Sequence, residues 1–186
     1  LSPIFLYFPI FSTMSHFIPY FLLFLQPFAF ILNFEGLHPD KYNVLCDKGN
    51  NYNMVYGVND MEETEALVKK LAADGYELIN LCSAYDADMT AKVAEAGIRT
   101  CAADYMESEA AKLDKVEDFS EYGVIIVDAG LAETAAYELK DPVANTHIRF
   151  IRDVDGACEA AKGLVADGVT FIELCSWFDA EKTNAV

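Results

Sequence analysis

The sequence has none of the short motifs that identify many common protein classes. Its five cysteines (46, 82, 101, 158 and 175) form no C-x-x-C pair. An odd number of cysteines at such spacings is typical neither of a disulfide framework nor of a zinc ribbon, so we expect reduced thiols in a cytoplasmic protein. The chain also has no Walker loop and no G-x-G-x-x-G or G-x-S-x-G sequence. We therefore expect no cofactor and no metal.

Positive charge is scarce. The chain has 13 Lys and Arg residues against 30 Asp and Glu residues, which gives a formal net charge of −17. A surface this acidic repels phosphate backbones and anionic lipid headgroups, so we expect no nucleic-acid partner. The 186 residues are 53% hydrophobic, which is ample for the packed core of one ordinary domain or two small ones.

Charged residues are absent from the first 34 positions. Four prolines interrupt any helix there, and no basic residue marks a signal peptide or a cytoplasmic flank. The composition matches pyrimidine-rich codons, as a gene model extended into upstream DNA would give. We favour a hydrophobic extension over residues 1–27 that is not part of the fold, with a membrane anchor as the second interpretation and a signal peptide as the third. A membrane location follows only if this segment is genuine.

An unusual phrase occurs twice, as DGYELINLCSAYDAD (74–88) and DGVTFIELCSWFDAE (167–181). The offset between Cys82 and Cys175 is 93 residues, and many flanking residues recur at the same offset. Two copies of one unit, joined head to tail, account for this pattern. We place copy 1 at residues 28–119 and copy 2 at residues 120–186.

Each copy alternates strand and helix patterns. In copy 1 we expect strands over 28–34, 53–58, 77–82 and 98–105 and helices over 60–75 and 86–96, with a helix or loop after the first strand. Copy 2 repeats this order but stops at Val186 inside its second helix, so we expect it to be incomplete. The fold class is α/β, with two tandem βαβαβ-type repeats and mainly parallel sheets. Open doubly wound sheets are preferred, and two half-barrels that form a TIM-like barrel are the alternative.

The third-strand sequence FIELCSWF (171–178) and the preceding segment 145–168 resemble a family of small α/β proteins of unknown function. Members of this family are single units of about this repeat length with an ELCGxF-like phrase on the third strand. Copy 1 matches more loosely, with LINLCSAY at 78–85, and Ser replaces Gly after the cysteine in both copies. The resemblance covers residues 28–186. It supports the fold and implies no activity.

The repeated phrase lies where the third strand passes into a helix. In parallel sheets ligands bind beyond the carboxyl ends of the strands, so this junction is where we expect a site. The candidate ligand-binding residues are Cys82 and Asp86 in copy 1 and Cys175, Ser176 and Asp179 in copy 2. The structural alternative is that the cysteine packs as a small hydrophobe and the aspartate begins the helix.

Glu173 is a carboxyl group inside an otherwise apolar strand, where burial is costly unless a partner is present. Strand alternation places it on the same face as Cys175, which disfavours the thiolate and a nucleophilic role for that cysteine. His147 and Arg149 share one face of the preceding strand and are candidate partners. We therefore assign Glu173 and His147 as candidate catalytic residues and Arg149 as a candidate ligand-binding residue.

The sequence favours a module that binds a small polar metabolite at the carboxyl edge of copy 2, with acid/base chemistry if it is an enzyme. The alternative is a non-catalytic structural protein that forms a homo-oligomer.

Overall fold

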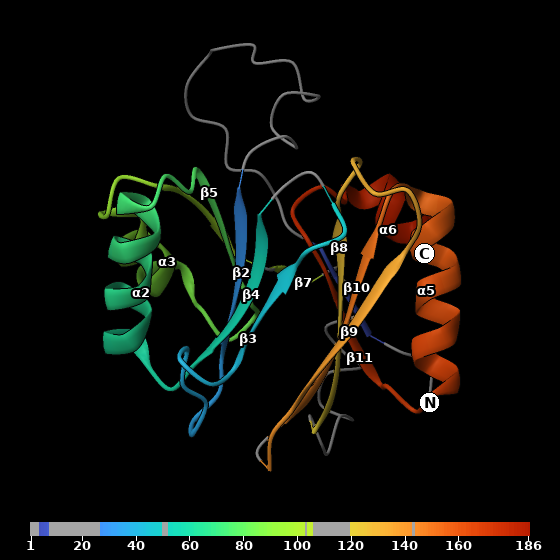
Figure 1. The fold of residues 1–186 in the computed structure, drawn as a ribbon, viewed down its shortest axis with the longest axis horizontal. Helices are drawn as coiled ribbons and strands as arrows, with labels where there is room; N and C mark the ends of the chain where they lie inside the picture. Colours follow the sequence, from blue (N-terminus) through green and yellow to red (C-terminus); the bar gives the residue numbers. More distant parts are fainter. Residues whose placement is uncertain (1–3, 8–26, 50–51, 103, 106–119, 143) are drawn as a thin grey trace.

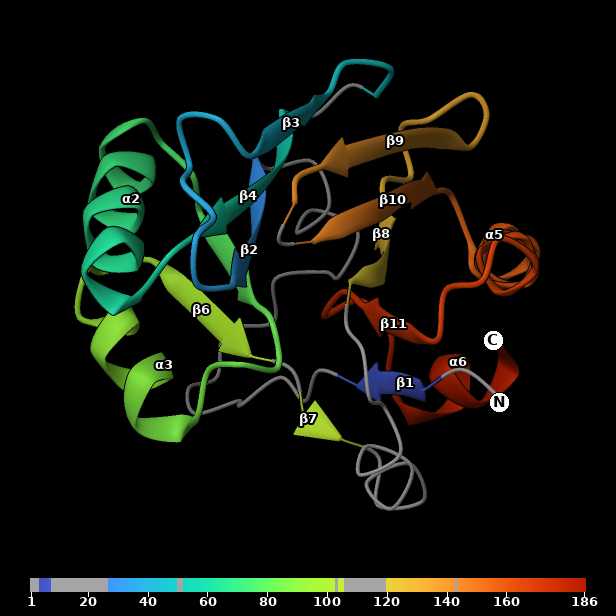
Figure 2. The ribbon, with the colours of Figure 1, turned by 90° about the horizontal axis from the view of Figure 1, so that it is seen from below.

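The computed structural model describes residues 4–7, 27–49, 52–102, 104–105, 120–142 and 144–186. The described strands form two open sheets that face each other, with a pair of helices on the outer side of each sheet (Figures 1 and 2). Within the described residues no closed barrel forms, which confirms open sheets over the barrel alternative. None of the helices in these ranges is long and apolar enough to cross a membrane.

Copy 1 forms the five-stranded sheet, in the order β3-β4-β2-β5-β6. Strands β2, β4, β5 and β6 are parallel, and β3 pairs antiparallel with β4. The helices α2 and α3 lie on its outer face (Figure 2). The elements of copy 1 are β2 (Phe28–Asn33), β3 (Asn43–Cys46), β4 (Asn53–Val58), α2 (Met61–Ala73), β5 (Leu78–Leu81), α3 (Ala87–Ala94) and β6 (Arg99–Ala102).

Copy 2 supplies four strands of the six-stranded sheet, whose order is β7-β1-β11-β8-β10-β9, and the other two come from the predicted extension (β1) and from copy 1 (β7). Strand β8 lies between parallel neighbours β10 and β11, and β9 pairs antiparallel with β10. The elements of this sheet and its helices are β1 (Ile4–Tyr7), β7 (Asp104–Tyr105), β8 (Glu121–Val127), β9 (Ala135–Lys140), β10 (Asn145–Ile151), α5 (Val154–Ala166), β11 (Phe171–Leu174) and α6 (Ala180–Ala185).

The helix ends follow local sequence signals in both copies. The side chains of Asp60 and Asp153 cap the N-termini of α2 and α5 by accepting hydrogen bonds from Glu63 N and Gly156 N. Gly75 and Gly168 follow the two helices with φ of 88° and 93°, a left-handed conformation that favours glycine. The predicted helix boundaries therefore agree with the structure because capping is a local property.

Four features differ from the expectation. The single strand predicted over 98–105 is divided into β6, in the five-stranded sheet, and β7, which pairs antiparallel with β1 in the six-stranded sheet. The connection after the first strand is an antiparallel edge strand in each copy, β3 or β9, and not a helix. The other sheet, and not a second layer of helices, faces the inner side of each sheet. Residues 4–7 of the predicted extension form β1, which pairs parallel with β11 at Ile4–Phe171. In copy 1 the corresponding place beside β5 belongs to β6. The remainder of the predicted extension, apart from Pro27, lies outside the described residues.

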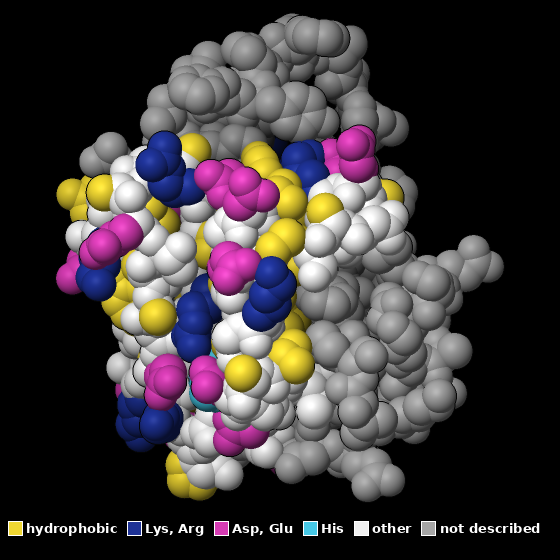
Figure 3. Space-filling model, turned by 90° about the vertical axis from the view of Figure 1, so that its right-hand side faces the viewer, with side chains coloured by type: hydrophobic (Ala, Val, Ile, Leu, Met, Phe, Trp, Pro, Cys, Tyr) yellow, Lys and Arg dark blue, Asp and Glu magenta, His cyan; other side chains and the backbone are white. Residues whose placement is uncertain are grey.

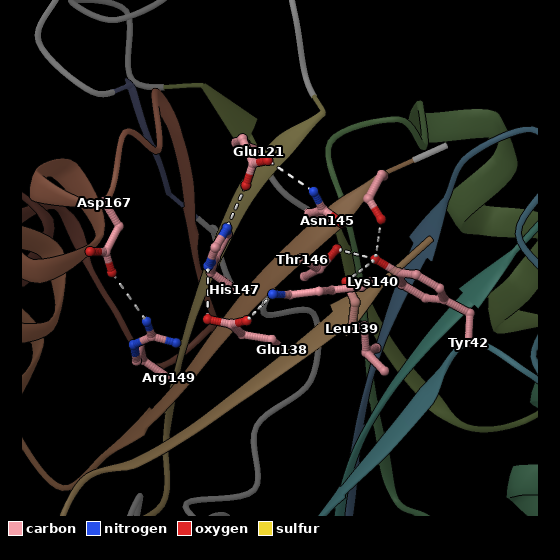
Figure 4. Close-up of polar contacts among 11 residues, drawn as sticks. Tyr42, Glu121, Glu138, Leu139, Lys140, Asn145, Thr146, His147, Arg149 and Asp167 are labelled. Atoms are coloured by element: carbon pink, nitrogen blue, oxygen red, sulfur yellow. Dashed lines mark hydrogen bonds and ion pairs between the residues drawn. The ribbon is translucent and has the colours of Figure 1, made fainter. Parts of the chain in front are cut away.

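Buried polar groups connect the two sheets. The Tyr42 hydroxyl donates to Thr146 Oγ1 at 2.8 Å, and it lies 3.1 Å from Ala144 O and 3.2 Å from Leu139 O (Figure 4). Asn53 Nδ2, also from copy 1, donates to Asp128 Oδ2 at 2.9 Å. The facing surfaces of the sheets are thus fixed by hydrogen bonds as well as by apolar contact.

We expect Tyr42→Phe to lower the free energy of unfolding by about 1–2 kcal/mol, because it removes a buried donor and leaves its acceptors in copy 2 without that partner. Tyr52→Phe is the matched control, since Tyr52 is 69% exposed. Urea denaturation of both variants measures the difference. Equal stabilities of the two variants would show that the Tyr42 hydroxyl does not hold the sheets together.

Candidate functional site

The repeated cysteines tie the third strand of each copy to the first. Cys82 N donates to Ile31 O at 3.0 Å, and its Sγ accepts from Asn33 N at 3.3 Å. Cys175 N donates to Ile125 O at 3.0 Å, and its Sγ accepts a hydrogen bond from the last residue of β8 at 3.4 Å. The thiols are thus structural acceptors in both copies.

Both thiols are protonated at neutral pH. Burial raises the pKa of Cys82 to about 12, and the charge of Glu173 adds to this increase. Burial also raises the pKa of Cys175 to about 11. Since the thiolate is the nucleophile, neither cysteine is prepared for covalent chemistry.

The aspartates of the repeated phrase are helix caps. Asp86 accepts from Met89 N at the start of α3, and Asp179 accepts from Lys182 N at the start of α6. Lys182 also pairs with Asp179 and lies over the ring of Trp177. These contacts account for the recurrence of the aspartate without a ligand.

The residue after each cysteine joins the two copies. Ser83 N donates to Glu173 Oε1 at 2.8 Å, and Ser176 N donates to Asn80 Oδ1, also at 2.8 Å. At the repeat offset of 93 residues, Asn80 corresponds to Glu173 and Ser83 to Ser176. The hydrogen bonds are therefore reciprocal: each copy supplies the acceptor for the turn of the other. Asn80 and Ser83 were not predicted as site residues, although the repeat offset alone relates them to Glu173 and Ser176.

Glu173 is fully buried at this junction. Its Oε2 makes no hydrogen bond of normal geometry with the described residues. Loss of hydration raises the pKa of Glu173 to about 7, and hydrogen bonding by Ser83 and Tyr122 limits the increase. The site therefore contains a carboxyl group that exchanges its proton near neutral pH.

His147 and Arg149 lie on the opposite face of the sheet from Glu173. The strand register places Glu173 beside Val124, and Val124 beside Ile148. Because side chains alternate along a strand, Ile148 shares the face of Glu173 while its two neighbours point to the helix side. The structure therefore does not form the expected cluster of Glu173 with His147 and Arg149.

The helix-side residues have carboxylate partners of their own (Figure 4). His147 Nε2 lies 2.6 Å from Glu121 Oε2, and its Nδ1 lies 3.7 Å from Glu138 Oε1. Arg149 pairs with Asp167 at 3.8 Å. Acidic and basic side chains lie next to one another on this side of the molecule (Figure 3). These pairs explain why basic residues occur here without a ligand.

The remaining candidates are placed as follows. Ser176 and Cys175 lie at the inter-copy junction with Glu173, together with Cys82 from copy 1, whereas Asp86 and Asp179 lie at the helix starts. Within the described residues, no group of three or more His, Cys, Asp or Glu side chains is arranged to hold a metal ion.

Fold and site together define a tandem-duplicated α/β protein whose two units are joined by hydrogen bonds between their third strands and the turns that follow them. Residues 26–121 and 120–186 each match a family of unknown function, DUF6506. The chain belongs to this family and contains two tandem copies of its unit. No curated protein and no solved structure matches the chain.

We expect Glu173→Gln to change how stability depends on pH. The folded chain retains the Glu173 proton up to about pH 7, whereas the unfolded chain loses it near 4.5. The wild type should therefore lose stability relative to the variant as pH rises from about 4.5 to about 7, by up to about 3 kcal/mol, and no further above that range. Urea denaturation of both proteins across this range measures the difference. A difference that does not change with pH would contradict the raised pKa.

Thiol labelling at neutral pH should modify Cys158 first. Cys82 and Cys175 are buried and protonated, so we expect them to react at least about tenfold more slowly than Cys158, which is only partly buried. Mass spectrometry after timed labelling checks this order, and labelling in denaturant confirms that all sites can react. Fast labelling of Cys175 in the folded protein would instead indicate an activated thiol.

Proposed function

We propose that the protein binds a small polar metabolite at the carboxyl edge of copy 2, where this copy meets copy 1, and that Glu173 contacts the ligand. The observation that carries the proposal is a fully buried carboxyl group at the junction of two mainly parallel sheets, where burial raises its pKa to about 7. Ligands of parallel sheets bind beyond the carboxyl ends of the strands. Buried ionisable groups with shifted pKa values are concentrated at functional sites.

Acid/base chemistry is the reaction class that this group suits. A carboxyl group with a pKa near 7 is present in both protonation states at neutral pH, so it can donate or accept a proton. His147 has no part in this proposal, because it lies on the opposite face of the sheet. We propose a cytoplasmic location, which the five free cysteines support.

A second candidate is a non-catalytic structural protein. The reciprocal hydrogen bonds favour it, because Asn80 and Glu173 each satisfy a backbone N–H of the other copy. In this alternative Glu173 only joins the copies, and surfaces outside the junction mediate homo-oligomer formation.

A thermal-shift screen of the full chain against small polar metabolites tests the proposal. We expect at least one compound to raise the melting temperature of the wild type and to lose that effect in Glu173→Gln. Glu159→Gln is the matched control, because it removes the same charge from a side chain that is 75% exposed on α5. Compounds that stabilise wild type and Glu173→Gln equally would refute a role for Glu173, and stabilisation of neither would favour the structural alternative.

A further inference from the structure

We propose that the ligand at the junction carries a positively charged amine, which places its ammonium group against the carboxylate of Glu173. This inference rests on the proposed function and specifies the chemical class of the ligand. Two properties of the surroundings of Glu173 support it. The hydrogen-bond donors there are neutral, and no basic side chain of the described residues pairs with Glu173.

Glu173 has no basic partner among the described residues. No Lys, Arg or His of the described ranges forms an ion pair with Glu173 or lowers its pKa. The two basic residues that the sequence analysis assigned to Glu173 pair with other carboxylates: His147 with Glu121, and Arg149 with Asp167. An ionised carboxylate in such a place is unfavourable until a positive group arrives.

The hydrogen-bond donors that act on Glu173 carry no charge. The side chain and backbone N–H of Ser83 and the Tyr122 hydroxyl favour the ionised form of Glu173, but all are neutral and do not offset its charge. Cys82 also faces the carboxyl group, and its pKa of about 12 keeps it neutral throughout the physiological range. The buried Oε2, which makes no hydrogen bond of normal geometry with the described residues, is the acceptor available to an ammonium donor.

The net negative charge of the protein also favours a cationic ligand. A net charge of −17 attracts cations to the surface and repels carboxylates and phosphates. An anionic ligand would therefore meet unfavourable charge both at the surface and at Glu173, whereas an amine meets favourable charge at both.

Ligand binding has consequences for the protein. Glu173 is fully buried, so a ligand reaches it only if the packing around this side chain opens. An ammonium ligand binds the ionised form, so the protonated form of Glu173 must release its proton on binding. The affinity should therefore increase with pH through the range near 7, while an alkylamine remains protonated.

The experiment compares matched small molecules on the full chain. Ethylamine, butylamine and putrescine are the amine probes, butanol and butanediol the neutral analogues, and butyrate and succinate the anionic ones. Isothermal titration at about pH 6 and about pH 8 gives the affinities. We expect amines alone to bind, with affinity that rises about tenfold over this interval. Binding should be lost in Glu173→Gln and kept in Glu159→Gln.

Each result has a distinct meaning. Glu173-dependent binding of the neutral or anionic probes but not of the amines would overturn this inference and leave the proposed function standing. If none of the probes binds and the metabolite screen also gives no Glu173-dependent hit, both are overturned. If Glu173→Gln does not fold, the pH dependence of the wild-type affinity decides, since an unchanged amine affinity between the two pH values excludes contact with a titrating carboxyl.

Discussion

Two backbone N–H groups at the centre of the molecule need acceptors, and each finds one in the opposite copy. The turns after the third strands leave Ser83 N and Ser176 N pointing across the junction, and the side chains of Glu173 and Asn80 accept their hydrogen bonds. A backbone donor shielded from water and left without a partner costs about 1–3 kcal/mol, which is more than the roughly 0.5–1.5 kcal/mol that a made hydrogen bond contributes. The two sheets are therefore held in one relative position, and the cysteine thiols and aspartate caps stabilise the turns that present these donors.

The sequence predicts much of each unit and little of how the units meet. Helix caps at Asp60 and Asp153, the glycine helix ends and the apolar parallel strands depend on neighbouring residues, so their patterns are visible in the chain. The edge strands β3 and β9 were not predicted because these short segments, NVLC and AAYELK, have no clear strand pattern of their own, and pairing with β4 and β10 specifies them. Strand β1 was missed for a related reason, since its partner β11 lies more than 160 residues away.

At the candidate site, too, the sequence predicts the properties of single residues but not the contacts between strands and between copies. Glu173 was predicted as a buried acid from its apolar neighbours, and it is one. Its expected pairing with His147 was wrong because the alternation of side chains along each strand does not fix the register between strands. Only the pairing of β8 with β10 and β11 shows that Glu173 shares a face with Ile148 and not with His147. The true partner, Ser83, contributes a backbone group, and no side-chain pattern identifies a backbone group in advance.

Covalent linkage of the two units lets the junction be asymmetric. If two separate, identical subunits met in this way, the position of Asn80 and Glu173 would hold the same residue twice, and the interface would contain two acids or none. Here one side is an amide, whose Nδ2 donates to Cys101 Sγ at 2.9 Å, and the other is an acid. Gene duplication thus allows a single proton-exchanging group to evolve within an otherwise two-fold arrangement, because each half can mutate without changing the other.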